Sequence, residues 1–382
     1  MAEPVKGHEF LVRLKEQGDK RHQSYDRFYD DYLDRKAREK GIPIFGQLEL
    51  TPLCNFDCRM CYTHLTKDQM NGKQLLTVDQ WKQLVNDAWK AGLLRVNLTG
   101  GECLAYPGFR ELYLYLHSLG VEIRVLTNGA LLNEEWISFF RAHPPILIQI
   151  SLYGGDEDTY ERVTGQRKFS VVAENIRRIR ETELPLLIAI TPNRYMGEGM
   201  EDTIRAAKAF DVPYFINSYL IDPREETGRS GQDHDLTVDD YVKIFRLRNE
   251  LDGVENQSVD PELLPPPGGP HHECSECGLL CTAGMSSFDI SWDGGMYPCN
   301  SFRTVAGYPL ADGFLPCWGK LHQMAASWPR IPECIECPYE SLCTVCLVKK
   351  ASYAGPGKQP LALCEQTRYF VQHGVMSIPI CD

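Results

Sequence analysis

Six apolar, strand-sized runs alternate with amphipathic helical stretches between residues 47 and 251, and this alternation restricts the fold more than any other feature of the chain. Apolar strands separated by helices are typical of a parallel sheet, because parallel neighbours need a right-handed crossover connection. The pattern therefore predicts an α/β fold, either an incomplete barrel or a doubly wound open sheet. The predicted strands cover 47–53, 95–98, 122–126, 146–152, 186–191 and 213–219, and the predicted helices cover 77–91, 107–119, 133–142, 170–183, 201–210 and 238–251.

Glycines and small polar residues directly follow several of the predicted strands. Thr99-Gly100-Gly101-Glu102 follows the second strand, Thr127-Asn128-Gly129 the third, and Ser151-Leu152-Tyr153-Gly154-Gly155 closes the fourth. Parallel α/β folds bind their ligands at the carboxyl ends of the strands. We therefore expect these loops to form one mouth in which a ligand approaches the backbone.

Three cysteines, Cys54, Cys58 and Cys61, follow the first predicted strand with the spacing Cys-x3-Cys-x2-Cys. Three thiolates on one loop can each bind one iron of a cubane iron–sulfur cluster and leave the fourth iron open. A structural zinc site usually has four protein ligands. The spacing thus favours a metal centre with an open coordination position. Part of a zinc knuckle and a set of buried thiols are the alternatives.

Cysteine usage and charge narrow the functional class. The chain has 15 cysteines in 382 residues, four before residue 104 and eleven from residue 274 onward, which favours metal ligands over disulfides in a reducing compartment. The formal net charge of −12 argues against a nucleic-acid partner. The N-terminus lacks the apolar core of a signal peptide and no run of about 18 apolar residues occurs, so we expect a cytoplasmic protein without a membrane partner.

The cysteine loop after the first strand and Gly100-Gly101-Glu102 after the second resemble the radical S-adenosylmethionine (SAM) superfamily. The resemblance implies a partial (β/α)6 barrel and a [4Fe–4S] cluster, held by Cys54, Cys58 and Cys61, whose open iron binds the amino and carboxylate groups of SAM. The resemblance also implies that Gly100, Gly101 and Glu102 contact the methionine amino group of SAM and that the Tyr62 backbone contacts the adenine. Ser151 would contact the ribose or the carboxylate, and Arg162 the carboxylate.

A second field of cysteines follows a Pro- and Gly-rich stretch in the C-terminal third of the chain. It contains Cys274-x2-Cys277-x3-Cys281, Gly294-x4-Cys299 and Cys334-x2-Cys337-x5-Cys343-x2-Cys346, and then Cys364. Residues 288–298 predict a hairpin that turns at Asp293-Gly294. This field resembles the SPASM domain, a small cysteine-rich extension of many radical SAM enzymes that carries two auxiliary iron–sulfur clusters.

The SPASM resemblance also implies how the cysteines are shared between two auxiliary [4Fe–4S] clusters. Cys334, Cys337, Cys343 and Cys364 would hold the distal cluster. Cys281, Cys299 and Cys346 would hold the proximal one, with Cys274 or Cys277 as the fourth ligand. The chain departs from the family at Cys343-x2-Cys346, where three residues usually intervene.

We expect four segments along the chain: an N-terminal helical extension over residues 1–45, the radical SAM barrel over 46–253, a Pro-rich linker over 254–273, and the SPASM domain over 274–382. The last would combine a β-hairpin with irregular and helical segments. The charged N-terminal extension is interpreted as a solvated helix laid over the barrel, with a substrate-docking arm as the alternative.

Three cysteines stand outside the predicted ligand sets: Cys103, Cys317 and Cys381. Each is interpreted as a buried, inert thiol, and a hydrogen-atom donor is the alternative. Asn300 stands where the sulfatase-maturing branch has an acidic residue. The missing general base favours peptide natural-product maturation over sulfatase maturation.

The resemblance implies an enzyme that cleaves SAM reductively and abstracts a hydrogen atom from a ribosomal precursor peptide or a protein. An external donor such as flavodoxin or ferredoxin would supply the electron. The product would be a crosslink, a thioether, an epimerised residue or a related change. The alternatives are sulfatase-maturase-like oxidation, small-molecule cofactor biosynthesis, and a non-catalytic iron–sulfur carrier or zinc scaffold. The Gly-Gly-Glu loop argues against the last, because a carrier needs no methionine site.

Overall fold

The computed structural model describes residues 27–217, 220–229, 236–254, 279, 281–343 and 345–374. The chain forms two compact units, each assembled from segments that are far apart in the sequence. The first unit, called the barrel unit below, joins residues 31–235 with 283–324. The second, called the C-terminal unit, takes its described residues from 1–30, 236–282 and 325–382.

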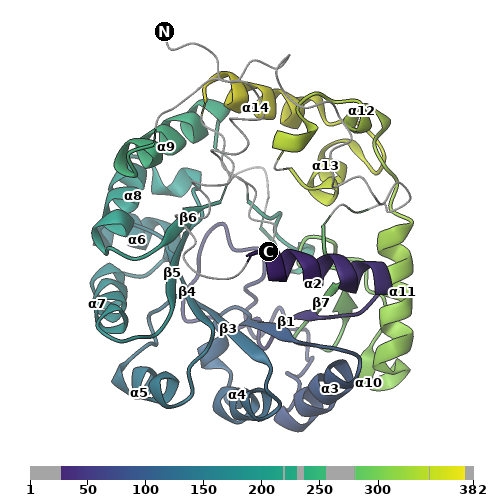
Figure 1. The fold of residues 1–382 in the computed structure, drawn as a ribbon. Helices are drawn as coiled ribbons and strands as arrows, with labels where there is room; N and C mark the ends of the chain where they lie inside the picture. The colour runs from purple at the N-terminus through teal and green to yellow at the C-terminus, as the bar shows by residue number, and fades with distance from the viewer. Residues whose placement is uncertain are drawn as a thin grey trace. The chain divides into compact units, whose positions relative to one another are not determined.

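One mixed sheet forms the centre of the barrel unit (Figure 1). Its strands are hydrogen-bonded in the order β6-β5-β4-β3-β2-β1-β7-β8, and every neighbouring pair from β6 to β7 is parallel. The strands are β1 (Phe45–Glu49), β2 (Arg95–Thr99), β3 (Glu122–Thr127), β4 (Leu147–Leu152), β5 (Leu186–Ile190), β6 (Tyr214–Ile216), β7 (Ser287–Ile290) and β8 (Met296–Tyr297).

The strand order decides between the two architectures that the sequence left open. A doubly wound sheet reverses its order at a switch point. Here β1 to β6 follow one another without reversal, as in a barrel, and Figure 1 shows the helices on the outer side of the curved sheet. This confirms the predicted partial (β/α)6 barrel. The covering helices are α3 (Val78–Lys90), α4 (Phe109–Ser118), α5 (Glu134–Ala142), α6 (Glu157–Thr164), α7 (Phe169–Arg180) and α8 (Gly199–Ala209).

Burial alternates along the central strands. In β3 and β4 every second residue is buried and the residues between are half-buried. Because strand side chains point to opposite faces, one face packs under the helices and the other faces the barrel interior. The interior face includes polar residues such as Asn97, Arg124 and Gln149, so the barrel offers a polar lining to a ligand.

Local capping explains where several helices begin. Thr77, the N-cap of α3, accepts a hydrogen bond from the Gln80 N–H, and the Gln80 side chain accepts one from the Thr77 N–H, which completes a capping box. Asn133 caps α5 and Asp156 caps α6, and in each case the side chain accepts one hydrogen bond from a backbone N–H of the first turn. β1 ends at Glu49, four residues before its predicted end, and Pro52 in the following segment has no N–H to donate to a ladder.

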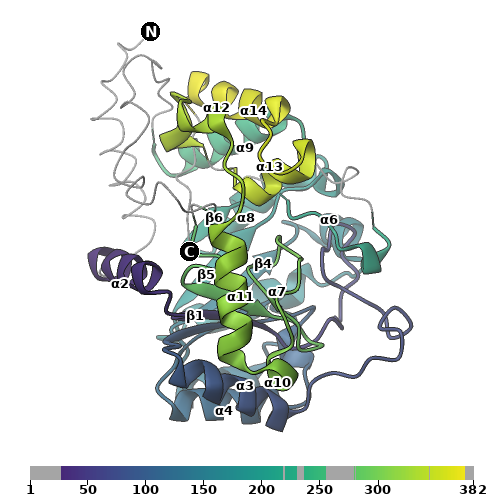
Figure 2. The same cartoon turned by 90° about the vertical axis from the view of Figure 1, so that its right-hand side faces the viewer.

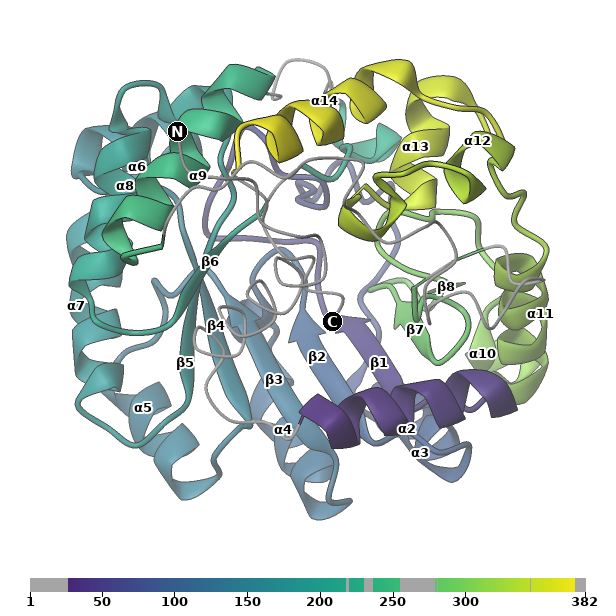
Figure 3. The same ribbon diagram turned by 45° about the horizontal axis from the view of Figure 1, so that its top comes forward.

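The predicted hairpin is present as β7 and β8, and it belongs to the barrel unit (Figure 3). β7 pairs in parallel with β1, so Phe45 lies opposite Ser287 and Leu48 opposite Ile290. The helix α11 (Phe314–Ala326) follows, and Phe288 packs edge-on against Phe314 with ring centroids 5.2 Å apart. The short α10 (Pro309–Asp312) lies beside α3 (Figure 2).

Helix α2 (Arg27–Lys40) is the described part of the N-terminal extension. It ends at Gly41, whose backbone has a positive φ of 63°, a conformation that glycine adopts readily at the end of a helix. The indole N–H of Trp318 donates to the Gly41 carbonyl at 2.7 Å and fixes this end of the helix to α11.

The C-terminal unit contains α9 (Val238–Leu251), α12 (Pro332–Ile335), α13 (Leu347–Ala354) and α14 (Leu361–Gln372). The predicted boundaries differ from the structure at α9, which had been assigned to the barrel segment 46–253. Tyr241 and Phe245 of α9 pack edge-on against Phe370 of α14, with centroids 6.1 and 5.8 Å apart, and this aromatic contact joins α9 to the C-terminal unit. Within the described ranges, no helix has both the length and the apolarity to cross a bilayer. The predicted linker beyond residue 254 lies outside the described residues.

Candidate functional site

The three-cysteine loop begins after β1, at the carboxyl end of the sheet, and its first residues pack on the loop that follows β2. The Gly101 N–H donates to the Thr51 carbonyl at 2.6 Å, and the Glu102 N–H donates to the Leu53 carbonyl at 3.0 Å. The structure therefore confirms that the cysteine loop and the Gly-Gly-Glu loop lie side by side.

Gly100 and Gly101 are required by the closeness of these two backbones. A Cβ atom on Gly100 would lie 2.4 Å from the Thr51 carbonyl oxygen, and one on Gly101 would lie 2.5 Å from that of Leu53. Both are shorter than any van der Waals contact, and a backbone neighbour has no rotamer by which to move away. Any side chain here would displace the segment that leads into Cys54.

The cysteine loop also completes the end of a helix. The last carbonyls of a helix have no partner within it. At the C-terminus of α6, the Asp57 N–H donates to the Thr164 carbonyl and the Arg59 N–H to that of Val163, each at 3.0 Å. The middle of the loop is thus fixed by backbone hydrogen bonds.

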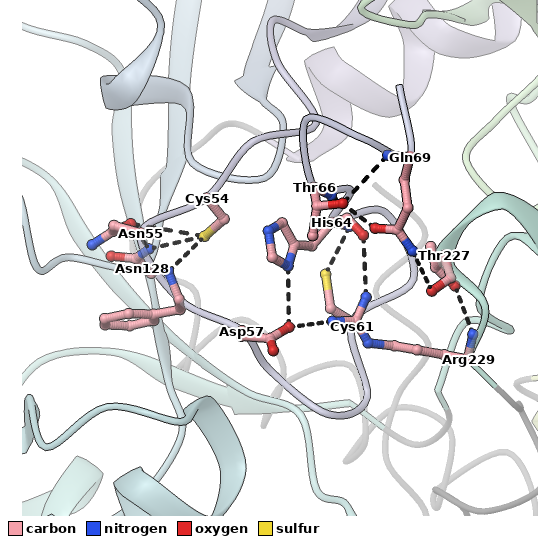
Figure 4. A network of polar contacts seen from close by, with 11 residues as sticks. Cys54, Asn55, Asp57, Cys61, His64, Thr66, Gln69, Asn128, Thr227 and Arg229 are labelled. Atoms are coloured by element: carbon pink, nitrogen blue, oxygen red, sulfur yellow. Dashed lines mark hydrogen bonds and ion pairs between the residues drawn. The ribbon is translucent and has the colours of Figure 1, made fainter. Parts of the chain in front are cut away.

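Two of the three thiols accept hydrogen bonds from their surroundings (Figure 4). Cys54 Sγ accepts from the Phe56 N–H at 3.3 Å and lies 3.6 Å from the side-chain amide of Asn128, which follows β3. Cys61 Sγ accepts from the His64 N–H at 3.2 Å. Such donors orient the sulfurs and favour their anionic form.

A segment after β6 fastens the far side of the loop (Figure 4). Arg229 forms an ion pair with Asp57 and donates to the His64 carbonyl at 3.1 Å, while Gln69 donates to the Thr227 carbonyl at 3.1 Å. We call these contacts the Arg229 clasp. The Asp57 carboxylate also lies 3.3 Å from His64 Nδ1. Burial and the Arg229 charge lower the pKa of His64, so the ring is neutral at neutral pH.

The thiols oppose one another's ionisation. Burial, the nearby Glu102 carboxylate and Cys61 raise the pKa of Cys54 to about 12. Burial followed by Cys61 and Cys54 raises the pKa of Cys58 well above its ordinary value, and burial also raises that of Cys61. Aromatic rings of Phe56, Tyr153 and Tyr160 pack on one another next to the loop and keep it apolar. Three buried thiolates are stable only against bound positive charge, so the donor set fits an iron–sulfur cluster.

A cluster places each thiolate on a different iron, whereas a single ion draws its ligands to one point. In the described part of the chain, no three His, Cys, Asp or Glu side chains form a group that could hold one metal ion.

Glu102 lies deeper than the sequence indicated, with only 1% of its surface exposed. One carboxylate oxygen accepts from the Thr127 hydroxyl at 2.8 Å and the Leu104 N–H at 3.1 Å, and the other accepts from the Asn128 N–H at 2.8 Å. Burial raises the pKa of this carboxyl above its ordinary value. A carboxylate oxygen has two acceptor sites, so the oxygen bound to Asn128 can accept one further donor. The predicted ammonium contact stays a prediction.

The remaining predicted SAM contacts have other partners in this structure. The Tyr62 carbonyl accepts from the Arg224 N–H at 3.2 Å, and Arg224 lies over the Tyr62 ring. Ser151 is half-buried on β4 and hydrogen-bonds Tyr153. Arg162 is exposed and donates to the Thr159 hydroxyl and the Met196 carbonyl. The roles of Tyr62, Ser151 and Arg162 toward SAM stay predictions.

Asn300 lies close to the predicted site, because its amide nitrogen is 3.5 Å from the Tyr62 hydroxyl. Two of the spare cysteines, Cys103 and Cys317, are fully buried, with 0% exposure. Cys103 Sγ donates to the Leu126 carbonyl at 3.2 Å, and burial raises the pKa of both thiols. Both observations agree with inert thiols. Cys381 lies outside the described residues.

The C-terminal unit contains a pocket with an empty volume of about 360 Å³ that four cysteines line. They are the four predicted to hold the distal auxiliary cluster: Cys334, Cys337, Cys343 and Cys364. The set of donors fits such a cluster, since four thiols meet at one pocket. We call it the four-cysteine pocket.

A lysine reaches into the four-cysteine pocket. Lys350 of α13 is 6% exposed, and its amine lies 3.4 Å from Cys334 Sγ. Burial lowers the pKa of Lys350, but the thiolates of Cys343 and Cys334 outweigh this and raise it above its ordinary value. The Thr367 hydroxyl lies 3.6 Å from Cys343 Sγ.

The predicted proximal ligands are divided between the two units. Cys299 is in the barrel unit, where its Sγ accepts from the Phe302 N–H at 3.3 Å. Cys281 and Cys346 are in the C-terminal unit. Cys346 is the N-cap of α13 and accepts from the Lys349 N–H. Cys274 and Cys277 lie outside the described residues, so the proximal ligand set stays a prediction.

Sequence reasoning missed three charged residues next to these sites. Arg224 forms a buried, bidentate ion pair with Glu49 of β1, and Arg229 forms the clasp. Lys350 points at cysteine sulfur. The two arginines stand in the segment after β6, where the strand-end rule that flagged the other loops applies equally well. For Lys350 the sequence offers no local pattern, because Cys334 is 16 residues away.

Comparisons with known proteins show what this chain is similar to. Residues 48–207 match the radical SAM superfamily. The sporulation killing factor maturation protein SkfB of Bacillus subtilis is 26% identical over 273 residues, which are 71% of this chain and 63% of SkfB. The AdoMet-dependent heme synthase of Methanosarcina barkeri is 24% identical over 335 residues, 81% of this chain and 92% of that enzyme. This chain thus spans less than two thirds of SkfB.

Among solved structures, Streptococcus suis SuiB bound to its precursor peptide SuiA has a similar fold. The TM-score is 0.68 at 16% sequence identity, and the alignment covers 94% of this chain and 88% of SuiB. At this identity the comparison shows the fold, and it confirms the predicted fold class for nearly the whole chain.

Proposed function

This chain belongs to the radical SAM superfamily, and from that premise we propose that it modifies a ribosomally made precursor peptide by hydrogen-atom abstraction. The superfamily's cofactors are a [4Fe–4S] cluster and SAM, and the chain is an enzyme of this class. When bound, the cluster supplies the electron that cleaves SAM into methionine and a 5′-deoxyadenosyl radical.

The observation that carries the proposal is the packing of the three-cysteine loop on the Gly-Gly-Glu loop at the carboxyl end of the sheet. Cys54, Cys58 and Cys61 would hold the cluster. The free acceptor site on Glu102 would bind the SAM ammonium through a charge-assisted hydrogen bond. The buried rings beside the loop exclude water, which protects a reactive radical from side reactions.

Two comparisons support a peptide substrate. SkfB is named for the maturation of a sporulation killing factor, and SuiB has been solved with a precursor peptide bound. Asn300, next to Tyr62, cannot act as the general base that the sulfatase-maturing branch has at this position. An external one-electron donor, flavodoxin or ferredoxin, would reduce the cluster in a reducing cytoplasm. The auxiliary cysteines would hold two further clusters.

The test starts with anaerobically reconstituted full-length protein, SAM and dithionite. We expect 5′-deoxyadenosine, and we expect Cys58→Ala to abolish it. Cys317→Ala is the matched control, since it removes a buried thiol from α11 without touching the loop. Cleavage of SAM by Cys58→Ala at the wild-type rate would refute the assignment of the loop.

A small-molecule substrate is the second candidate, because the alignment covers 92% of the heme synthase. Co-expression with a short peptide encoded beside the gene, followed by mass spectrometry, separates the two. A SAM-dependent mass change on the peptide supports the first candidate. An unmodified peptide, with SAM cleavage stimulated by a porphyrin precursor instead, supports the second.

A further inference from the structure

Lys350 is unusual because lysines are almost never fully buried unless they are paired. It is 6% exposed, and its amine reaches cysteine sulfur, with Cys334 Sγ at 3.4 Å. Lys350 and Cys334 both line the four-cysteine pocket. A buried ammonium in this place acts directly on whatever the four thiolates bind.

Each one-electron reduction makes an iron–sulfur cluster and its four thiolates one charge more negative. The potential of such a cluster depends on net charge, on hydrogen bonds to the sulfurs and on solvent exposure. Lys350 changes the first two together, since it contributes a positive charge and a donor. We propose that Lys350 is a positioning residue that stabilises the reduced state of the cluster held by Cys334, Cys337, Cys343 and Cys364, and so makes this cluster an electron acceptor.

The step needs no group other than the cluster and an external one-electron reductant. The reductant loses one electron and the cluster gains it, while Lys350 keeps its proton and forms no bond. The inference rests on the cluster assignment of the proposed function and is independent of the substrate. Iron content tests whether the four cysteines hold a cluster, and the reduction potential tests the effect of Lys350 on it. The cluster assignment and the Lys350 proposal can therefore fail separately.

The chain provides a matched control on the same helix. Lys349 is also 6% exposed, but its amine lies over the Tyr353 ring, 5.1 Å from the ring centroid. It is not among the residues that line the four-cysteine pocket. Lys349→Met and Lys350→Met therefore remove the same charge from α13, and only the second removes it from a residue that lines the four-cysteine pocket. Arg368 lines the pocket too, but it is exposed, so solvent screens its charge.

The experiment is a redox titration of the reconstituted full-length protein, followed by electron paramagnetic resonance. We expect Lys350→Met to lower one midpoint potential so that the ratio of reduced to oxidised cluster at a fixed potential falls about tenfold, which equals about 59 mV for a one-electron couple. The other reduction steps should not move. Lys349→Met and Lys350→Arg should reproduce the wild-type titration.

An unchanged titration of Lys350→Met at full iron content would overturn the proposal. An equal shift in Lys349→Met would also overturn it, because the effect would then belong to the charge of the helix. If Lys350→Met loses iron, Lys350→Arg decides: a wild-type midpoint supports the proposal, and a tenfold shift refutes it, because arginine keeps the charge.

Discussion

The three-cysteine loop and the four-cysteine pocket differ in how their sulfurs are held and in which charged groups lie beside them. The loop takes its sulfurs from one continuous segment, and backbone contacts with β2 and α6 hold that segment in place. Its nearby cation, Arg229, is paired with Asp57. The pocket takes its sulfurs from separate elements and has a buried ammonium within reach of them.

The difference teaches what each site is suited for. A cluster that must reduce SAM benefits from an apolar setting in which the surrounding cations are already neutralised, because its reduced state is then a strong reductant. A cluster whose sulfur ligands lie beside a buried ammonium accepts an electron more readily. The comparison supports the proposal that the loop holds an electron-donating cluster and the pocket an electron-accepting one.

The largest effect should separate the sites by function. Cys58→Ala should abolish 5′-deoxyadenosine formation, because it removes a ligand of the predicted SAM-binding cluster. Cys337→Ala alters only the pocket and should leave SAM cleavage within about tenfold of wild type, since sites that share no partners act nearly independently. Chromatographic quantification of 5′-deoxyadenosine measures both. Complete loss in Cys337→Ala would break the distinction between the sites.

Gly101→Ala should be the next most severe change. Its Cβ would lie 2.5 Å from the Leu53 carbonyl, so the backbone must shift, which should lower the free energy of unfolding by about 1–3 kcal/mol. The protein should also lose the iron of one cluster, the one predicted at the three-cysteine loop. Gly319→Ala is the control, because nothing lies within 4 Å of its Cβ and it is inside α11. We expect that variant to gain about 0.5–1 kcal/mol. Normal iron in Gly101→Ala would show that the close approach is dispensable.

Arg229→Ala tests the clasp. It leaves Asp57 and the His64 carbonyl without their donor, which should cost about 1–3 kcal/mol and speed iron loss from the three-cysteine loop alone. Arg167→Ala breaks exposed pairs with Asp158 and Glu161, which solvent screens, so it should change stability less than Arg229→Ala does. Chelator-driven iron release and thermal unfolding distinguish them, and equal behaviour of the two variants would argue against a clasp.

The last prediction is a pH dependence on the barrel side of the comparison. Burial raises the pKa of Asp289 on β7 to about 7. The folded state therefore keeps this proton at pH values where the unfolded state loses it. Its stabilisation is complete below the ordinary aspartate pKa of about 4 and is lost as the pH rises to about 7.

Asp289→Asn should remove this dependence, which amounts to at most about 1.4 kcal/mol per pH unit. Asp68→Asn, at an exposed position, should preserve it. Denaturant unfolding of the apo-proteins at pH 5 and pH 7.5 provides the measurement. A parallel pH dependence in wild type and Asp289→Asn would show that Asp289 is not its source.

The sequence was most informative where contacts are local. Cys-x3-Cys-x2-Cys and the Gly-Gly-Glu loop identify themselves by spacing, and the capping box at Thr77 needs only residues three apart. The four cysteines that the SPASM resemblance assigns to the distal cluster also line one pocket, and their role as its ligands stays a prediction.

Long-range partners could not be read from the chain. Arg229 and Asp57 are 172 positions apart, and no composition or periodicity joins them. Strand order is also non-local, so the alternating pattern could not separate a barrel from an open sheet. The packing of α9 is non-local as well, since its aromatic face is completed by Phe370.

The pairing of β1 with β7 has a consequence for biosynthesis. Gln47 and its partner Asp289 are separated by 242 positions. At about 5–20 residues per second, the strand that leads into the three cysteines leaves the ribosome roughly 12–50 s before the strand that covers its edge. During that interval one side of β1 is an open template for pairing with another chain. Insertion of the first cluster into a finished site must therefore wait for the C-terminal third of the chain.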